Sequence, residues 1–260
     1  MSIENANRIV VKVGTSSLTH STGMLNLRKV TALINVLADL HNMGKELILV
    51  SSGAVGVGTP KLALKNRPTS MRERQAAAAI GQSELMNIYK THFSQYGKNV
   101  AQLLLTKIVL DMEDMRNNTL NTLDVLLEHG IIPIINENDA ISTYELEFGD
   151  NDTLSAYVAT LCNADLLVIM TDIDGLYDKN PQENPDAKLI SVVDKIDDNI
   201  HNMAGSEGSA FGTGGMKTKI MAAEIATKTC DMMIVNGSTP DILYDIFDGK
   251  QPGTLFRKQV

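Results

Sequence analysis

Short apolar runs rich in β-branched residues alternate along the chain with stretches that have helical periodicity. The apolar runs occupy residues 8–14, 46–58, 99–106, 130–139, 164–172 and 231–237. The helical stretches between and after them are 25–44, 71–93, 118–130, 152–162 and 215–230. This alternation predicts an α/β fold with a mostly parallel sheet, and the unbroken apolar character of the strands predicts helices on both of its faces.

One region departs from the alternation. Residues 178–210 are rich in Pro, Asp and Gly, and we expect a connecting segment there with a short strand at 188–193. The sequence shows no internal repeat, low-complexity segment or linker, so we expect a single domain over residues 1–260. Ligands of open α/β sheets bind at the carboxyl ends of the strands, so the segments that directly follow the apolar runs are the places to look for chemistry.

The charge balance excludes some classes of ligand. The 260 residues carry 23 Lys and Arg against 31 Asp and Glu, a formal net charge of −8, with no basic run. Such a chain is a poor partner for a nucleic acid backbone, and the absence of Trp makes base stacking an unsuitable mode of binding. The sequence has no signal peptide pattern and no apolar run of the roughly 18 residues that a membrane span needs. We therefore expect a soluble, cytoplasmic protein with no nucleic acid or membrane partner.

Two glycine-containing segments follow the first two apolar runs. The segment "VVKVGTSSLT" places Lys12 at a strand end, directly before a turn at Gly14. The segment "VSSGAVGVG" contains Gly53, Gly56 and Gly58, whose order differs from the dinucleotide-binding fingerprint. Both segments can present backbone amides to an anion, and the second can open a helix. Both are also compatible with ordinary tight turns, so each interpretation stays open on the residues alone.

The strongest candidate for a phosphate-binding loop is "GTGGMKTK" at residues 212–219. It is not a Walker A motif, because Met216 separates Gly215 from Lys217. Lys217 and Lys219 fall in the first turns of the predicted helix, where positive charge opposes the helix dipole. An anionic ligand explains this placement better than local stability does.

Acidic and amide side chains follow other apolar runs. The segment "TDIDGLYDKNP" carries Asp172, Asp174 and Asp178, but Tyr177 occupies the position where a calcium-binding EF-hand loop needs Gly. An acidic turn remains its alternative explanation. The segment "INENDAIS" has polar residues throughout 136–139, which is more than a turn requires.

The segment "GDNDTLSAYVA" places two acids around an amide, immediately before an apolar helix. Capping of the helix is the simple interpretation, and the organisation of cations around a phosphate is the functional one. Together the segments supply anion loops, lysines, carboxylates and amides at neighbouring strand ends. Phosphoryl transfer uses this inventory, because it depends on positioning and charge neutralisation.

The segments named above, taken in their order along the chain, resemble the amino acid kinase family, and within it the members that act on glutamate. The resemblance implies a three-layer αβα sandwich around an open, mostly parallel sheet. It implies ATP-dependent phosphorylation, with Mg²⁺, of the side-chain carboxylate of L-glutamate to L-glutamyl 5-phosphate, the first step of proline biosynthesis. That carboxylate ionises near pH 4.3, so no general base is required.

The resemblance also assigns roles to residues. Lys12 and Lys219 would contact the transferring phosphoryl group, and Asp152 would orient both lysines. The glutamate-binding residues would be Ser52, Asp139 and Asn151, with Asn136 and Asp150 nearby. The nucleotide-binding residues would be Lys12, Thr171, Asp172, Thr213, Gly214, Gly215, Met216, Lys217, Thr218 and Lys219. No residue is assigned as a metal ligand. Residues from 1 to about 160 would serve mainly the amino acid, and those from about 161 to 260 mainly the nucleotide.

Many bacterial members of the family continue into an RNA-binding-like domain, and the end of this sequence leads us to expect that it is absent. The resemblance further implies a homo-oligomer that is inhibited by proline. Two alternatives stay open: another amino acid kinase acting on aspartate or acetylglutamate, and a non-catalytic nucleotide or amino acid sensor on the same fold. The presence of Lys12, Lys219 and Asp152 favours an enzyme over a sensor.

Overall fold

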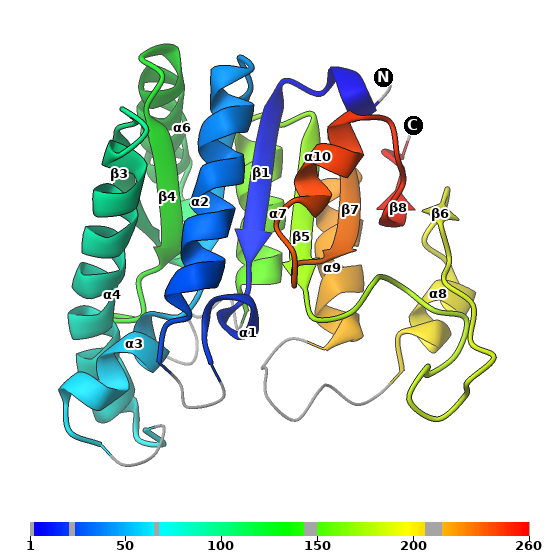
Figure 1. Cartoon of the computed structure of the whole chain (residues 1–260), viewed down its shortest axis with the longest axis horizontal. Coiled ribbons are helices and arrows are strands. Elements are labelled where there is room, and N and C mark those ends of the chain that lie inside the picture. Colours follow the sequence, from blue (N-terminus) through cyan, green and yellow to red (C-terminus); the bar gives the residue numbers. More distant parts are fainter. Residues whose placement is uncertain (1–2, 21–23, 65–67, 143–149, 206–214, 260) are drawn as a thin grey trace.

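The central element of the protein is an eight-stranded sheet with the strand order β3-β4-β2-β1-β5-β7-β8-β6 (Figure 1). A computed structural model describes residues 3–20, 24–64, 68–142, 150–205 and 215–259. The strands are β1 (Arg8–Val13), β2 (Glu46–Ser51), β3 (Val100–Leu105), β4 (Ile132–Glu137), β5 (Leu166–Thr171), β6 (Val192–Val193), β7 (Asp231–Asn236) and β8 (Gly253–Phe256). Neighbouring strands are parallel except for β7 and β8, which are antiparallel.

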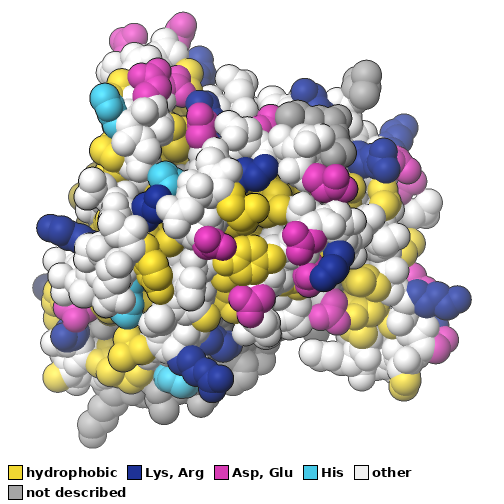
Figure 2. Space-filling model, turned by 45° about the horizontal axis from the view of Figure 1, so that its top comes forward, with side chains coloured by type: hydrophobic (Ala, Val, Ile, Leu, Met, Phe, Trp, Pro, Cys, Tyr) yellow, Lys and Arg dark blue, Asp and Glu magenta, His cyan; other side chains and the backbone are white. Residues whose placement is uncertain are grey.

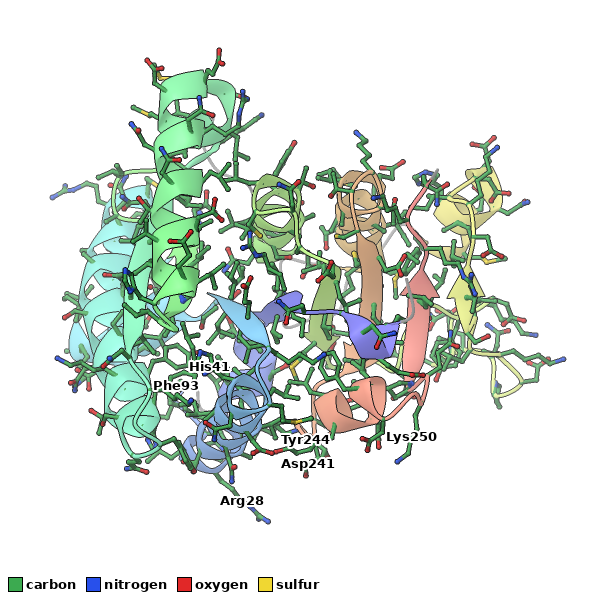
Figure 3. All side chains as sticks on the ribbon, turned by 90° about the horizontal axis from the view of Figure 1, so that it is seen from above. Arg28, His41, Phe93, Asp241, Tyr244 and Lys250 are labelled. Carbon is green, nitrogen blue, oxygen red and sulfur yellow. The ribbon has the colours of Figure 1, made fainter. Side chains whose placement is uncertain are left out.

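Helices cover both faces of the sheet and make a three-layer sandwich, which confirms the predicted fold class. The helices are η1 (Ile3–Asn5), α1 (Thr15–Leu18), α2 (Leu27–Asn42), α3 (Ala54–Lys61), α4 (Met71–Ser94), α5 (Lys107–Asp111), α6 (Glu113–Glu128), α7 (Asn151–Leu161), α8 (Asp198–Met203), α9 (Met216–Ala226) and α10 (Ile242–Phe247). Helices α2, α4 and α10 share one core with the sheet, and α6, α7 and α9 share the other. Figure 3 looks along the strands and separates these two layers, with the labelled Arg28 and Tyr244 on the side of α2 and α10.

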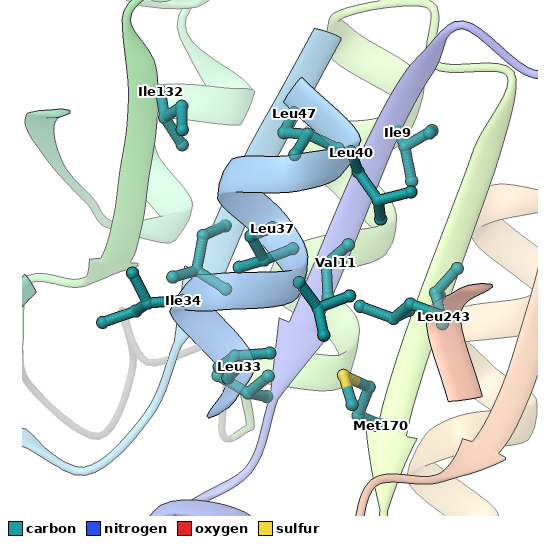
Figure 4. Close-up of a cluster of buried hydrophobic side chains, with 14 of the residues drawn as sticks. Ile9, Val11, Leu33, Ile34, Leu37, Leu40, Leu47, Ile132, Met170 and Leu243 are labelled. Carbon is teal, nitrogen blue, oxygen red and sulfur yellow. The ribbon is translucent and has the colours of Figure 1, made fainter. Parts of the chain in front are cut away.

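The alternation of side chains along β1 decides what faces each layer. Ile9 and Val11 belong to the core under α2, shown in Figure 4, whereas Val10 belongs to the core under α7 and α9. Burying such side chains stabilises the fold by about 1.5–3 kcal/mol each. Because side chains two residues apart share a face, Lys12 follows Val10 to the side of α7 and α9.

Each predicted apolar run contains a strand, as expected from the sequence. The second run is divided, because β2 ends at Ser51 and Ala54 begins α3. The short strand expected at 188–193 is reduced to Val192–Val193, β6. The sequence analysis missed β8, whose four residues are too few to show a periodic pattern, and it missed the short helices α1, α5, α8 and α10.

Helices α3 and α4 cross at a pair of glycines. A Cβ atom on Gly58 would lie 1.8 Å from the carbonyl oxygen of Ala77, and one on Gly81 would lie 1.8 Å from that of Ala54. The backbones therefore touch, and only glycine permits this approach at both positions. Gly53 precedes α3 with a φ of +113°, a left-handed conformation that turns the chain from β2 into the helix.

The N-terminal and C-terminal halves of the chain form separate halves of the sheet. Strands β1 to β4 lie on one side, strands β5 to β8 lie on the other, and β1 and β5 pair at the centre. The direction of winding changes there, and such a switch point in an open α/β sheet is where ligands bind. The candidate residues of the sequence follow β1, β2, β4 and β5 at this edge.

Acidic and basic side chains are interspersed over the face shown in Figure 2, so neither sign of charge dominates that face. Among the described residues, no helix is both long enough and apolar enough to cross a membrane.

Candidate functional site

Helix α7 begins with two carboxylates that have different roles. Asp150 is the N-cap, and its Oδ1 accepts a hydrogen bond from the backbone N–H of Thr153 at 2.8 Å. Asp152 lies in the first turn with none of its surface exposed. The capping interaction therefore belongs to Asp150, and Asp152 is available for another purpose.

Asp152 is held between two lysines from different elements. Lys12 Nζ of β1 lies 2.6 Å from Asp152 Oδ1, and Lys219 Nζ of α9 lies 3.1 Å from Asp152 Oδ2. Thr218 Oγ1 donates a hydrogen bond to the same Oδ2 at 3.0 Å. The structure thus brings together the three residues that the sequence assigned to the phosphoryl group. Two ammonium groups held side by side give an anionic group charge-assisted hydrogen bonds.

The surroundings of Asp150 and Asp152 move their pKa values in opposite directions. Burial alone would raise the pKa of Asp152, but the charges of Lys12 and Lys219, with their hydrogen bonds, lower it below the ordinary 3.8. Burial raises the pKa of Asp150, and the nearby charge of Asp152 adds to the rise. Asp152 therefore stays ionised at neutral pH as the anion that holds both lysines.

A cluster of amide and hydroxyl groups lies next to these charges. Asn151 Nδ2 is 2.9 Å from Ser52 Oγ, 2.9 Å from Asn136 Oδ1 and 3.2 Å from the carbonyl oxygen of Ser51. The cluster joins the end of β2, the end of β4 and the start of α7. It unites three of the residues assigned to glutamate, namely Ser52, Asn136 and Asn151.

Asp139 lies in a neighbouring cavity of about 290 Å³. Its lining includes Ala54 from the start of α3, Gln82 from α4, and Glu137 and Asn138 from the end of β4. Gln82 also accepts a hydrogen bond from Asn136 at 2.8 Å, so it links this cavity to the amide cluster. The sequence analysis did not identify Gln82, and its only signal is a polar residue within an alanine-rich helix.

A second cavity, of about 580 Å³, lies on the side of the C-terminal half. Thr171 and Asp172 line it together with Gly215, Met216 and Lys219. These residues come from the end of β5 and the start of α9, so this cavity gathers part of the assigned nucleotide-binding set. Thr213 and Gly214 lie outside the described residues.

The start of α9 has features that suit an anion. Its N-cap is Gly215, which has no side chain to cap the first turn. The backbone N–H groups there can bind phosphate oxygens, which the helix dipole also favours. Lys217 has an exposed side chain and does not line the cavity, whereas Lys219 is 4% exposed and contacts Asp152. The two lysines of the loop are therefore in different environments.

Known proteins resemble the chain in both sequence and fold. The sequence profile of the amino acid kinase family matches residues 7–236, which is most of the chain. The chain belongs to the amino acid kinase family. A glutamate 5-kinase of Clostridium perfringens is 53% identical over 98% of this chain and 96% of its own length. A glutamate 5-kinase of Listeria innocua is 53% identical over 98% of this chain and 94% of its own.

Solved structures share the fold of the family. The carbamate kinase of Giardia lamblia bound to AMP-PNP has a TM-score of 0.68 at 16% identity, covering 98% of this chain and all of its own. The UMP kinase of Bacillus anthracis has a TM-score of 0.68 at 15% identity, covering 98% and 97%. The described residues of this family member contain no group of three or more His, Cys, Asp or Glu that could hold a metal ion.

The arrangement predicts that Asp152 serves turnover more than folding. We expect Asp152→Asn and Lys219→Ala each to lower kcat by about 10²–10³, because the first releases the two ammonium groups and the second removes one of them. The double variant should lose less than the product of the two effects, since both residues form one unit. Steady-state kinetics of both single variants and the double variant, with thermal melts, measure this.

The matched control is Asp150→Asn, which keeps a capping side chain at the start of α7. It should melt close to the wild-type temperature. If Asp152→Asn melts much lower but keeps near-normal kcat, Asp152 supports only the structure of the helix and the assigned role is wrong.

Proposed function

We propose that the protein transfers the γ-phosphoryl group of ATP to the side-chain carboxylate of L-glutamate, forming L-glutamyl 5-phosphate and ADP in the first step of proline biosynthesis. The single observation that carries the chemistry is the pair Lys12 and Lys219 held on the buried Asp152. The relatives named glutamate 5-kinase, at 53% identity over nearly the whole chain, support the choice of glutamate.

The reaction follows from the charges that the site holds. A carboxylate oxygen of glutamate attacks the γ-phosphorus, a new O–P bond forms, and the bond to the bridging oxygen breaks with its electron pair leaving on ADP. The carboxylate is already ionised at neutral pH, so no proton has to be removed. Lys12 and Lys219 stabilise the charge on the transferring group, and Asp152 keeps both ammonium groups directed at it.

The two cavities suggest where each substrate binds. ATP fits the 580 Å³ cavity at the ends of β5 and α9, with its phosphates toward the open first turn of α9. Magnesium would enter bound to the triphosphate as part of this substrate, because Mg²⁺ keeps phosphate and water ligands more readily than an all-protein cage. Residues from about 161 to 260 would thus serve mainly the nucleotide.

Glutamate would bind at the ends of β2 and β4, among residues 1 to about 160. Its ammonium group suits the acceptors Asp139, Asn151 and Asp150. Its α-carboxylate suits the first turn of α3, where the N-cap Gly53 offers no side-chain acceptor to the open amides.

We also propose a cytoplasmic homo-oligomer. The exposed apolar side chains of Ile108, Met112 and Met115 follow one another along α5 and α6, and such a group on a surface suits a subunit contact. Light scattering of the purified protein measures the mass that decides this.

The proposed activity predicts ADP release that requires glutamate. With ATP, Mg²⁺ and glutamate, hydroxylamine should trap the acyl phosphate as a hydroxamate. Aspartate and N-acetylglutamate, offered as controls at the same concentration, should give far less. Turnover with either control instead of glutamate would identify another amino acid kinase, and no turnover with any of them would favour a sensor.

Asp139 should act on glutamate and leave ATP binding nearly unchanged. Asp139→Ala removes an acceptor for the substrate ammonium group, and a lost hydrogen bond to a charged partner costs about 1.5–3 kcal/mol, which is about 10–100-fold. We expect the KM for glutamate to rise by that factor and the KM for ATP to change little. An equal rise in both values would show that Asp139 is structural.

Proline should inhibit by competing with glutamate. It carries the same α-amino and α-carboxyl groups, so the residues that hold those groups in glutamate can hold them in proline. Initial rates at several proline and glutamate concentrations should show inhibition that weakens as glutamate rises. Inhibition that persists unchanged at saturating glutamate would place proline at a separate site.

A further inference from the structure

Three amide side chains from three elements form a hydrogen-bonded series. Gln82 of α4 accepts at Oε1 from Asn136 Nδ2 at 2.8 Å, and Asn136 accepts at Oδ1 from Asn151 Nδ2 at 2.9 Å. Asn136 is the penultimate residue of the buried strand β4, and Asn151 is the first residue of α7, beside the ion pairs. We name Gln82, Asn136 and Asn151 the amide series.

One backbone group fixes the direction of the whole amide series. Asn136 Oδ1 also accepts from the backbone N–H of Glu137 at 2.9 Å. A backbone N–H can only donate, so the atom of Asn136 that faces it must be the oxygen. The NH₂ of Asn136 then faces Gln82, which must present an oxygen, and the oxygen of Asn136 requires a donor from Asn151. If any one of the three amide groups were rotated by 180°, it would place two donors or two acceptors against each other.

The fixed direction determines what the amide series presents at its two ends. At one end, Asn151 Nδ2 is surrounded by acceptors, because Ser52 Oγ and the carbonyl oxygen of Ser51 also lie within hydrogen-bonding distance. Its two protons are thus occupied, and its Oδ1 receives no hydrogen bond from the described residues. At the other end, Gln82 is 7% exposed, and its buried Nε2 has no acceptor among the described residues. Gln82 also lines the cavity that contains Asp139, so this end of the amide series lies at that cavity.

We propose that Gln82 is a positioning residue for the amino acid substrate. By holding the NH₂ of Asn136, it keeps the oxygen of Asn136 on Asn151, and Asn151 then presents its carbonyl oxygen to the ammonium group of the substrate. This inference rests on the proposed function. The nearby side chains assigned to the substrate, Asp139 and Asp150, also offer acceptors. Together with Asn151 they form a set that selects a free ammonium group over an acylated nitrogen.

The test compares one substitution that removes the acceptor offered to Asn136 with another that keeps it. Gln82→Met keeps the length of the side chain and removes the acceptor, so Asn136 and Asn151 lose their fixed direction. We expect the KM for glutamate to rise about tenfold, with the KM for ATP within about twofold. Gln82→Glu keeps an oxygen toward Asn136 and should return the KM for glutamate to within about threefold of the wild-type value.

A matched control comes from the same helix. Gln75 donates a hydrogen bond to the carbonyl oxygen of Ser142 and takes no part in the amide series. Gln75→Met should leave the KM for glutamate within about twofold. Circular dichroism and thermal melts of each variant establish that it is folded, and the ratio of the two KM values separates a positioning effect from a general loss of structure.

A double-mutant cycle tests whether Gln82 acts through Asn151, which it does not contact. In an Asn151→Ala background, Gln82→Met should add less than twofold to the KM for glutamate, because the group being positioned is gone. Full additivity, a KM for glutamate unchanged by Gln82→Met, or equal rises for glutamate and ATP would each overturn the proposal. Failure of the wild-type protein to phosphorylate glutamate would instead overturn the proposed function, so the two failures are distinguishable.

Discussion

The site depends on one buried carboxylate placed between two ammonium groups. Asp152 has no exposed surface, and its burial without partners would be unfavourable by several kcal/mol. Lys12 at 2.6 Å and Lys219 at 3.1 Å reverse that balance and lower its pKa. Each lysine is in turn almost buried and has Asp152 as its ionic partner. The three charged groups therefore stabilise one another only when β1, α7 and α9 are all in position.

The sheet is what brings those three elements together. Alternation along β1 sends Lys12 to the face covered by α7 and α9, and the pairing of β1 with β5 puts the two halves of the chain side by side. Asp152 and Lys219 are far apart in the sequence, and this packing lets them share a hydrogen bond. The Asp150 cap fixes where α7 starts, which places Asp152 in the first turn of the helix. Local capping and sheet topology thus act on the same carboxylate.

The sequence predicts the layers and the strand ends well, because unbroken apolar runs have few alternatives to buried strands. It also locates Lys12, Asp152 and Lys219, although from a resemblance and not from a pattern of spacing. It does not separate Lys217, which is exposed, from Lys219, which is buried, because that depends on how the first turns of α9 sit against α7. Gln82 is equally hidden, since its partner Asn136 lies 54 positions away on another element.

Helix α4 supports the ends of β2 and β4, and a glycine makes this possible. Gly81 lets α4 approach the start of α3 until backbone touches backbone. The next residue, Gln82, is then close enough to reach Asn136 at the end of β4, and two turns later Tyr89 reaches Ser51 at 2.7 Å. Burial raises the pKa of Tyr89 to about 12, so its hydroxyl stays protonated and the contact stays neutral. A bulkier residue at position 81 would push α4 outward and move both supports away together. The same close approach that packs the helices therefore sets the positions of Ser51 and Asn136, and through them the amide cluster that includes Ser52 and Asn151.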